Sequence, residues 1–375
     1  MKATMPVSRL PARLLSRSTV LTLLVAWAVT VGVMAGHGVV ANPATSAVAI
    51  GIFALILAAI MVAAFGVVRQ AERLAHLFGE PFGTLILTLT VVVIEVVLIS
   101  SVMLGPSAST TIGRDSLFAV MMVIINGVLG LALLLGALRH GPQAFNREGA
   151  SVYVAIIAAL SLCTLVLPNF TTSTSDGTLV PVQAVGLTVL AVALYAFFLH
   201  VQTGRGRELF VQRPATAVTR APVPRREVIQ RALLLVATVL PIVLLSHDLG
   251  VLVDLGIVET GAPPVLGGVI IAIIVFAPEA ITAVRASLAN ETQRTLNLGL
   301  GAFVSTVGLT IPAILVIGLV TGQEVVLGES PANMVLIAVT VLMTAVTFTS
   351  PRTTALHGAV HLMLFGVFAI LLFAP

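Results

Sequence analysis

The chain has 375 residues, of which 58% are hydrophobic and only 9% charged, and its mean hydropathy is +1.13. This composition excludes a soluble globular domain, in which about a quarter of the residues are charged. The formal net charge of +4 does not indicate nucleic-acid binding, because no basic segment is interleaved with aromatic residues. The single cysteine, Cys163, lies in an apolar run, so neither a disulfide framework nor a cysteine metal site is expected.

Eleven apolar runs follow one another along the chain, and each is long enough to cross a bilayer core, which takes about 20 helical residues. The runs are continuous rather than alternating, so they predict helices and exclude barrel strands. The fold class is therefore an all-α polytopic membrane protein. The expected helices are 20–40, 46–68, 82–104, 116–138, 150–168, 180–200, 228–247, 264–288, 298–320, 332–349 and 355–374.

A basic segment precedes the first run, so a cleavable signal peptide is an alternative for this part of the chain. We prefer a first transmembrane helix, because the run is long enough to span and the next helix follows closely. The N-terminal tail and this helix then occupy residues 1–41.

Basic side chains collect in alternate loops, and short loops rich in Lys and Arg stay on the cytoplasmic side of a membrane. Only Arg114, beside Asp115, breaks the alternation. We therefore expect a multi-pass protein of the cell inner membrane with a cytoplasmic N-terminus and an extracytoplasmic C-terminus. The opposite loops hold acidic residues without basic neighbours, namely Asp176, Asp248, Asp254, Glu259, Glu324 and Glu329.

Residues 201–227 form the longest polar stretch and are interpreted as a basic cytoplasmic linker between two halves. Five expected helices lie in residues 42–200 and five in residues 228–375. An odd number of spans gives the two halves opposite orientations in the membrane. Many secondary transporters have such inverted repeats and bind their substrate at the midplane between them.

Glu95 and Glu279 each lie near the middle of the second expected helix of a half, at the same interval after Gly83 and Gly267. A carboxylate at this depth costs several kcal/mol, so such residues usually face a cavity and serve an ion or proton path. The alternative is a structural pair that is hydrogen-bonded within the bundle. We expect a single site for cations and protons to which both halves contribute.

Ca²⁺ prefers about six to eight oxygen ligands, so neighbouring hydroxyl and amide groups are candidates for additional ligands. Small hydroxyl residues also mediate helix packing in membranes, which is the alternative for each of them. Pro278 is expected to kink its helix and to free a backbone carbonyl one turn earlier. The candidate ligands are Thr84, Thr88, Asn126, Thr282, Ser305 and Thr306.

His357 and His361 lie one turn apart in the last expected helix, a spacing that permits a proton relay or a metal pair. We expect an interfacial or packing role instead, because no third ligand lies nearby in the sequence.

Three stretches resemble the calcium/cation antiporter superfamily, in particular its bacterial Ca²⁺(Na⁺)/H⁺ antiporter group. They are similar to the two α-repeats of that family, here about 79–138 and 264–320. The resemblance implies that Glu95 and Glu279 ligate the transported metal ion, and that the chain is a secondary transporter rather than an enzyme. It implies no cofactor, and only the lipid bilayer and small cations as partners. The stretches are GEPFGTLILTLTVVVIEVVLIS (79–100), RDSLFAVMMVIINGVLG (114–130) and APEAITAVRASLANETQRTLNLGLGAFVSTVGLTIP (277–312).

The chain departs from this family in one informative place. Calcium/proton exchangers of fungi and plants carry a Gly-Asn pair three to four residues before each glutamate. Here those positions are Val91 and Val92, and Val275 and Phe276. The missing amide oxygens weaken the expectation of strict Ca²⁺ selectivity.

We therefore expect exchange of cytoplasmic Ca²⁺, or also of Na⁺ or K⁺, for external H⁺, since two carboxylates balance one Ca²⁺ or two protons. Monovalent Na⁺/H⁺ or K⁺/H⁺ antiport is the alternative favoured by the missing asparagines. A remote alternative is an intramembrane hydrolase, but the sequence has no HExxH, no GxSxG and no paired intramembrane aspartates.

Overall fold

The computed structural model describes residues 16–41, 43–78, 82–104, 110–174, 176–211, 225–263 and 265–374. Most of the predicted N-terminal tail and residues 212–224 of the basic linker lie outside these residues. Within them every regular element is helical, apart from two isolated β-bridges. The predicted all-α fold class is confirmed.

Each of the eleven predicted runs overlaps a helical segment. Two of the spans combine helices of different kinds, because a π-helix joins α5 to α6 and α7 continues into a π-helix and a 3₁₀-helix. The elements are α1 (Arg17–Ala35), α2 (His37–Ala41), α3 (Ser46–Phe78), α4 (Phe82–Met103), α5 (Ile112–Met121), η1 (Met122–Leu129), α6 (Gly130–His140), α7 (Arg147–Ser161), η2 (Leu162–Val166), η3 (Leu167–Phe170), α8 (Pro181–Thr203), η4 (Arg207–Leu209), α9 (Arg225–Thr260), α10 (Val265–Leu288), α11 (Thr292–Thr321), α12 (Pro331–Thr349) and α13 (Ala355–Phe373).

Ten helical segments of the described chain have the length and hydropathy needed to cross a membrane. The segment α4 adds a shorter apolar stretch, Thr88–Met103, to these ten. The protein is therefore a multi-pass membrane protein.

The helix α9 is longer than the sequence predicted. It was expected over 228–247 but runs for 36 residues to Thr260, which is about 54 Å at 1.5 Å per residue. The prediction was wrong because hydropathy falls at the first charged residues, whereas the buried face keeps its helical period through Leu245, Leu249 and Leu252. Three residues predicted in a loop therefore lie on helical turns: Asp248, Asp254 and Glu259.

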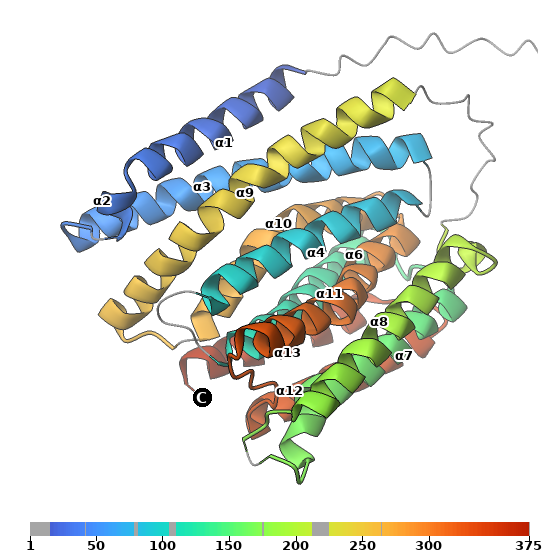
Figure 1. Cartoon of the computed structure of the whole chain (residues 1–375). Coiled ribbons are helices and arrows are strands. Elements are labelled where there is room, and N and C mark those ends of the chain that lie inside the picture. Colours follow the sequence, from blue (N-terminus) through green and yellow to red (C-terminus); the bar gives the residue numbers. More distant parts are fainter. Residues whose placement is uncertain are drawn as a thin grey trace, which may run out of the picture.

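The helices form three groups across the bundle (Figure 1). The helices α1, α3 and α9 lie together on one side, and α7, α8 and α12 lie on the other. Between them are α4 and α10, with α5, α6, α11 and α13. The two glutamate-bearing helices, α4 and α10, thus lie in the interior of the bundle.

Corresponding helices of the two halves make corresponding contacts. The helix α4 packs on α11 as α10 packs on α5, and α8 packs on α11 as α13 packs on α6. The loops follow the same rule, because the two antiparallel bridges join Gln143 to Thr353 and Thr178 to Val326. Each bridge joins the loop after the third helix of one half to the loop after the fourth helix of the other. This exchange is the arrangement expected of two inverted five-helix repeats.

The helices α6 and α13 approach closely at a pair of glycines. A Cβ atom built on Gly358 would overlap the Leu134 backbone nitrogen and lie 2.6 Å from the Gly130 carbonyl oxygen. Small residues of this kind allow the backbones of membrane helices to pack against each other. The contact fixes α13 against the span that carries Asn126.

We expect Gly358→Ala to lower the stability of the protein by about 1–3 kcal/mol, since the clash is with backbone atoms that have no alternative rotamer. The control is Gly366→Ala on the same helix, where a Cβ meets nothing within 4 Å. Stability is measured as the temperature at which half of the detergent-solubilised protein leaves the monodisperse peak in size-exclusion chromatography. Equal transition temperatures for Gly358→Ala and Gly366→Ala would contradict the close approach of α6 and α13 at Gly358.

Candidate functional site

Glu95 lies on α4 and is fully buried, with 0% exposure. The Thr306 hydroxyl on α11 donates a hydrogen bond to Glu95 Oε2 at 2.7 Å. The hydroxyl of Thr310, one turn further along α11, lies beside the same carboxylate. Glu95 Oε1 has no partner among the described residues, so half of this carboxylate is free to accept a further bond.

Glu279 lies on α10 and is 6% exposed. Neither of its carboxylate oxygens has a hydrogen-bond partner in the described part of the chain. A cavity of about 10 Å³ adjoins it, between Ile124 and Val128 of η1 and Gly299 and Ala302 of α11. That volume is about the size that admits one water molecule.

Both carboxylates lie beside α11. Glu95 bonds Thr306, and Ala302, four residues earlier, lines the cavity at Glu279. Four helical residues are one turn, or about 6 Å. Among the described residues no ion pair involves either glutamate. Buried charges need a counter-charge, so this arrangement can accept protons or a cation.

Most of the additional ligands predicted from the sequence have other partners. Thr282 donates to the Pro278 carbonyl at 2.9 Å within α10. Thr88 donates to the Leu85 carbonyl at 3.2 Å within α4. The side chain of Thr84 lies outside the described residues. Their roles as ligands remain predictions.

Ser305 lies on α11 next to Thr306 but bonds in another direction. It donates to the Gly301 carbonyl at 2.8 Å and accepts a hydrogen bond from Tyr195 Oη of α8 at 3.1 Å. Of the two neighbouring hydroxyls, only that of Thr306 contacts a glutamate.

Asn126 is buried in η1 and takes part in a polar network with α12 and α13. Its Nδ2 donates to Thr340 Oγ1 at 2.8 Å, and its Oδ1 accepts from His361 Nδ1 at 2.9 Å. His361 Nε2 lies 3.2 Å from the Thr347 hydroxyl. The bonds of Asn126 therefore fix three helices together, and its role as a cation ligand remains a prediction. His361 has a buried packing position, whereas His357 bonds the helix start at Thr354.

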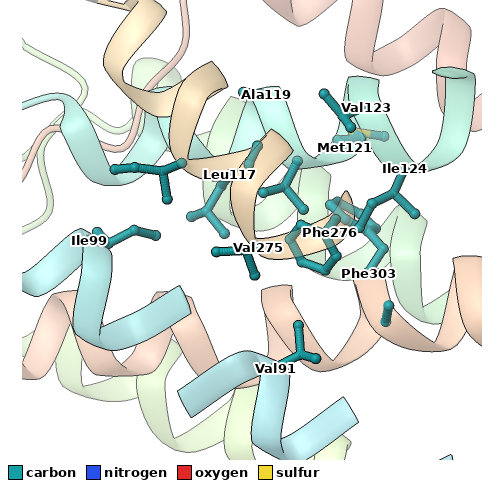
Figure 2. Close-up of a cluster of buried hydrophobic side chains, with 14 of the residues drawn as sticks. Val91, Ile99, Leu117, Ala119, Met121, Val123, Ile124, Val275, Phe276 and Phe303 are labelled. Carbon is teal, nitrogen blue, oxygen red and sulfur yellow. The ribbon is translucent and has the colours of Figure 1, made fainter. Parts of the chain in front are cut away.

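Apolar side chains occupy the positions at which fungal and plant exchangers carry Gly-Asn. Figure 2 shows Val91 of α4 and Val275 and Phe276 of α10 in one cluster with Ile124 and Phe303. All five side chains are buried. No amide oxygen is therefore available at these positions. In the described part of the chain, no group of three or more His, Cys, Asp or Glu side chains is placed to hold a metal ion.

A larger cavity of about 550 Å³ lies at the end of the bundle that carries most of the arginines. It reaches Pro278 and Thr282, which flank Glu279 on α10. Charged side chains line its mouth, and Arg294 pairs there with Glu291 at 3.0 Å and with Glu72 at 4.0 Å. The lining of this cavity therefore comes within one helical turn of Glu279.

Sequence reasoning did not identify two features of the site. Thr310 could have been found from its position one turn after Thr306. The small residues Gly299 and Ala302, which make room beside Glu279, gave no signal because glycine and alanine are common throughout membrane helices.

Matching contacts in the two halves, and a buried carboxylate in each half without an ion-pair partner among the described residues, are typical of secondary ion transporters. The model of the sodium/calcium exchanger protein family matches residues 48–204 and 231–374. The chain belongs to this family, as the resemblance of its α-repeats indicated, and it is a cation antiporter.

Individual relatives agree with this assignment. The chain is 38% identical over 323 residues to a protein of Sinorhizobium fredii named as ionic transporter y4hA, covering 84% of this chain and 86% of the relative. It is 32% identical over 345 residues to the sodium-potassium/proton antiporter ChaA of Escherichia coli, covering 88% and 91%. The solved structure of YfkE, named as a Ca²⁺/H⁺ antiporter, is similar in fold with a TM-score of 0.73 and 17% identity, covering 95% of this chain and all of that one.

We expect Thr306→Val to raise the cation concentration for half-maximal antiport by about tenfold or more, because a hydrogen bond to a charged group contributes about 1.5–3 kcal/mol. The measurement is initial exchange rate against cation concentration in proteoliposomes. Thr164→Val is the matched control, since this buried hydroxyl donates only to the Leu160 carbonyl of its own span. An unchanged half-maximal concentration in Thr306→Val would show that this hydroxyl does not support the site.

Proposed function

We propose that this protein exchanges a cation for protons across the cell inner membrane, with Glu95 and Glu279 alternately holding the cation and the protons. One observation carries the proposal: three of the four oxygens of these buried carboxylates have no partner in the described structure. Unpaired buried acceptors are costly, and either a proton or a cation removes that cost.

Competition between cation and proton follows from the chemistry of a carboxylate. An ionised carboxylate only accepts hydrogen bonds or ligates a cation, whereas a protonated one is neutral and donates. Two carboxylates close together titrate as a coupled pair, so cation binding at one releases protons from the pair. A site that is stable only when it holds either the cation or the protons couples the transport of the cation in one direction to the transport of protons in the other.

We place the arginine-bearing end of the bundle in the cytoplasm, according to the positive-inside rule. The cavity of about 550 Å³ then opens to the cytoplasm and gives access to Glu279. This placement puts the N-terminus inside and the C-terminus outside.

Na⁺ or K⁺ is the cation that the site supports best. The apolar side chains of Val91, Val92, Val275 and Phe276 leave few oxygens near the glutamates, while Ca²⁺ takes about six to eight. The relative ChaA, named as a sodium-potassium/proton antiporter, is 32% identical to this chain. Ca²⁺ is the second candidate, because its charge balances both carboxylates. This order reverses the expectation from the sequence, in which Ca²⁺ came first.

Glu95→Gln and Glu279→Gln are each expected to reduce exchange by on the order of a hundredfold or more, since a neutral amide carries neither the proton nor the compensating charge. Exchange is measured in everted vesicles as recovery of an imposed pH gradient on cation addition. Glu324→Gln, an exposed residue of the α11–α12 loop, is the control and is expected to exchange normally. Normal exchange by Glu95→Gln or by Glu279→Gln would refute the proposal that both residues hold the cation and the protons.

The choice of cation is tested by adding Na⁺, K⁺ or Ca²⁺ separately to the same vesicles. We expect Na⁺ or K⁺ to dissipate the gradient at lower concentration than Ca²⁺. Val92→Asn is expected to increase the response to Ca²⁺, because it restores an amide oxygen three residues before Glu95. Val92→Ala, which shortens the same side chain without adding an oxygen, is the control. If Ca²⁺ dissipates the gradient of the unaltered protein at a lower concentration than Na⁺ and K⁺ do, Ca²⁺ is the substrate.

A further inference from the structure

The loop between α11 and α12 connects both halves at the end of the bundle opposite most of the arginines. Val326 N donates to the Thr110 carbonyl at 3.0 Å, and Gly328 N donates to the Gly177 carbonyl at 2.8 Å. Arg114 of α5 donates to the Gly328 carbonyl. Two separate segments of the first half, residues 110–114 and Gly177, therefore hold this loop.

Glu329 ends this loop and is only 2% exposed. Its backbone is fixed on both sides, since its nitrogen donates to the Leu165 carbonyl at 2.9 Å and its carbonyl accepts from Asn169 Nδ2 at 2.9 Å. Glu329 Oε2 accepts from Asn333 Nδ2 at 2.8 Å. Glu329 Oε1 is buried and has no partner among the described residues.

The charges around Glu329 do not balance when it is ionised. Asp115 faces it from α5 together with Arg114, and these two form an ion pair of 3.2 Å. Thr111 donates to the other oxygen of Asp115 at 2.8 Å. The pair is neutral as a whole, so an ionised Glu329 gives the buried cluster a net charge of −1.

Other elements packed on this cluster bring no compensating charge. The spans η2 and η3 and the first turn of α12 have no acidic or basic side chain in the sequence, and the Cys163 thiol of η2 is exposed. Asp176, next to Gly177, and Glu324, in the same loop, are exposed and negative. Residues 105–109, outside the described structure, contain no titratable side chain. A proton on Glu329 is the simplest way to neutralise the cluster.

We propose that Glu329 is a second proton-binding site, separate from the Glu95 and Glu279 pair, and that its proton keeps the extracytoplasmic end of the bundle closed. The proposal rests on the proposed orientation and antiport. When Glu329 ionises, the unpaired buried charge favours hydration of the loop and loosens its contacts with the first half. External pH then controls access from that side.

The pKa of Glu329 is raised to about 7, mainly by burial; the hydrogen bond from Asn333 and the charge of Arg114 oppose this rise, and the Asp115 carboxylate adds to it. A group with this pKa changes from roughly 90% to roughly 10% protonated between about pH 6 and pH 8. The folded state binds this proton more tightly than the unfolded chain does. Its stabilising contribution is therefore complete below about pH 4.5 and is lost as the pH rises through about 7.

Proton binding is tested directly by infrared difference spectroscopy of the purified protein between acid and alkaline pH. The protein used carries Glu95→Gln and Glu279→Gln, which remove the two carboxyls of the proposed exchange site. The result therefore does not depend on transport. We expect a protonated-carboxyl band that titrates near pH 7, is lost on adding Glu329→Gln and is kept on adding Glu324→Gln. A spectrum that Glu329→Gln leaves unchanged would overturn the proposal without affecting the exchange site.

The effect on transport is tested in proteoliposomes with the wild-type pair Glu95 and Glu279, by varying pH only on the extracytoplasmic side. Glu329→Gln keeps the acceptor for Asn333 and imitates the protonated state. We expect the ratio of wild-type to Glu329→Gln exchange rate to rise severalfold from about pH 6 to about pH 8, while the ratio of wild-type to Glu324→Gln stays constant. A constant ratio for Glu329→Gln would show that its proton does not control access.

Discussion

The structure depends on one electrostatic constraint: two carboxylates, Glu95 and Glu279, are held in an apolar bundle, and no cationic side chain of the described residues forms an ion pair with either. The described residues provide a single hydrogen bond, from Thr306, to their four oxygens. A soluble protein would solve this problem with an arginine, and the exchange site would then be blocked. Leaving the pair unbalanced makes its stability depend on what occupies it, and that dependence is the basis of the exchange proposed above.

The inverted repeat explains how this unfavourable arrangement is supported. Each glutamate-bearing helix packs on the third helix of the other half, so neither half forms the site alone. The two antiparallel bridges and the glycine contact between α6 and α13 hold the surrounding helices close together. Packing energy spread over many apolar contacts thus compensates a local cost at the two carboxylates.

In the proposed site, residue type at individual positions decides which cation is favoured. Valine and phenylalanine before the two glutamates give packing where amide groups would give oxygen ligands, as Figure 2 shows for Val91, Val275 and Phe276. The amide of Asn126 instead joins η1 to α12 and α13 through Thr340 and His361. Polar side chains in this bundle therefore divide into those that connect helices and those that contact the site.

The sequence by itself determined the helical class, the number of apolar runs and the placement of a glutamate in each half, because hydropathy and charge act locally along the chain. It did not determine where α9 ends, since Leu249 and Leu252 continue the helix only when a neighbour buries them. Nor could it separate Thr306, which bonds Glu95, from Ser305, which bonds Tyr195. Adjacent residues on a helix point about 100° apart, so only the packing of α11 between α4 and α8 decided which hydroxyl reaches the carboxylate.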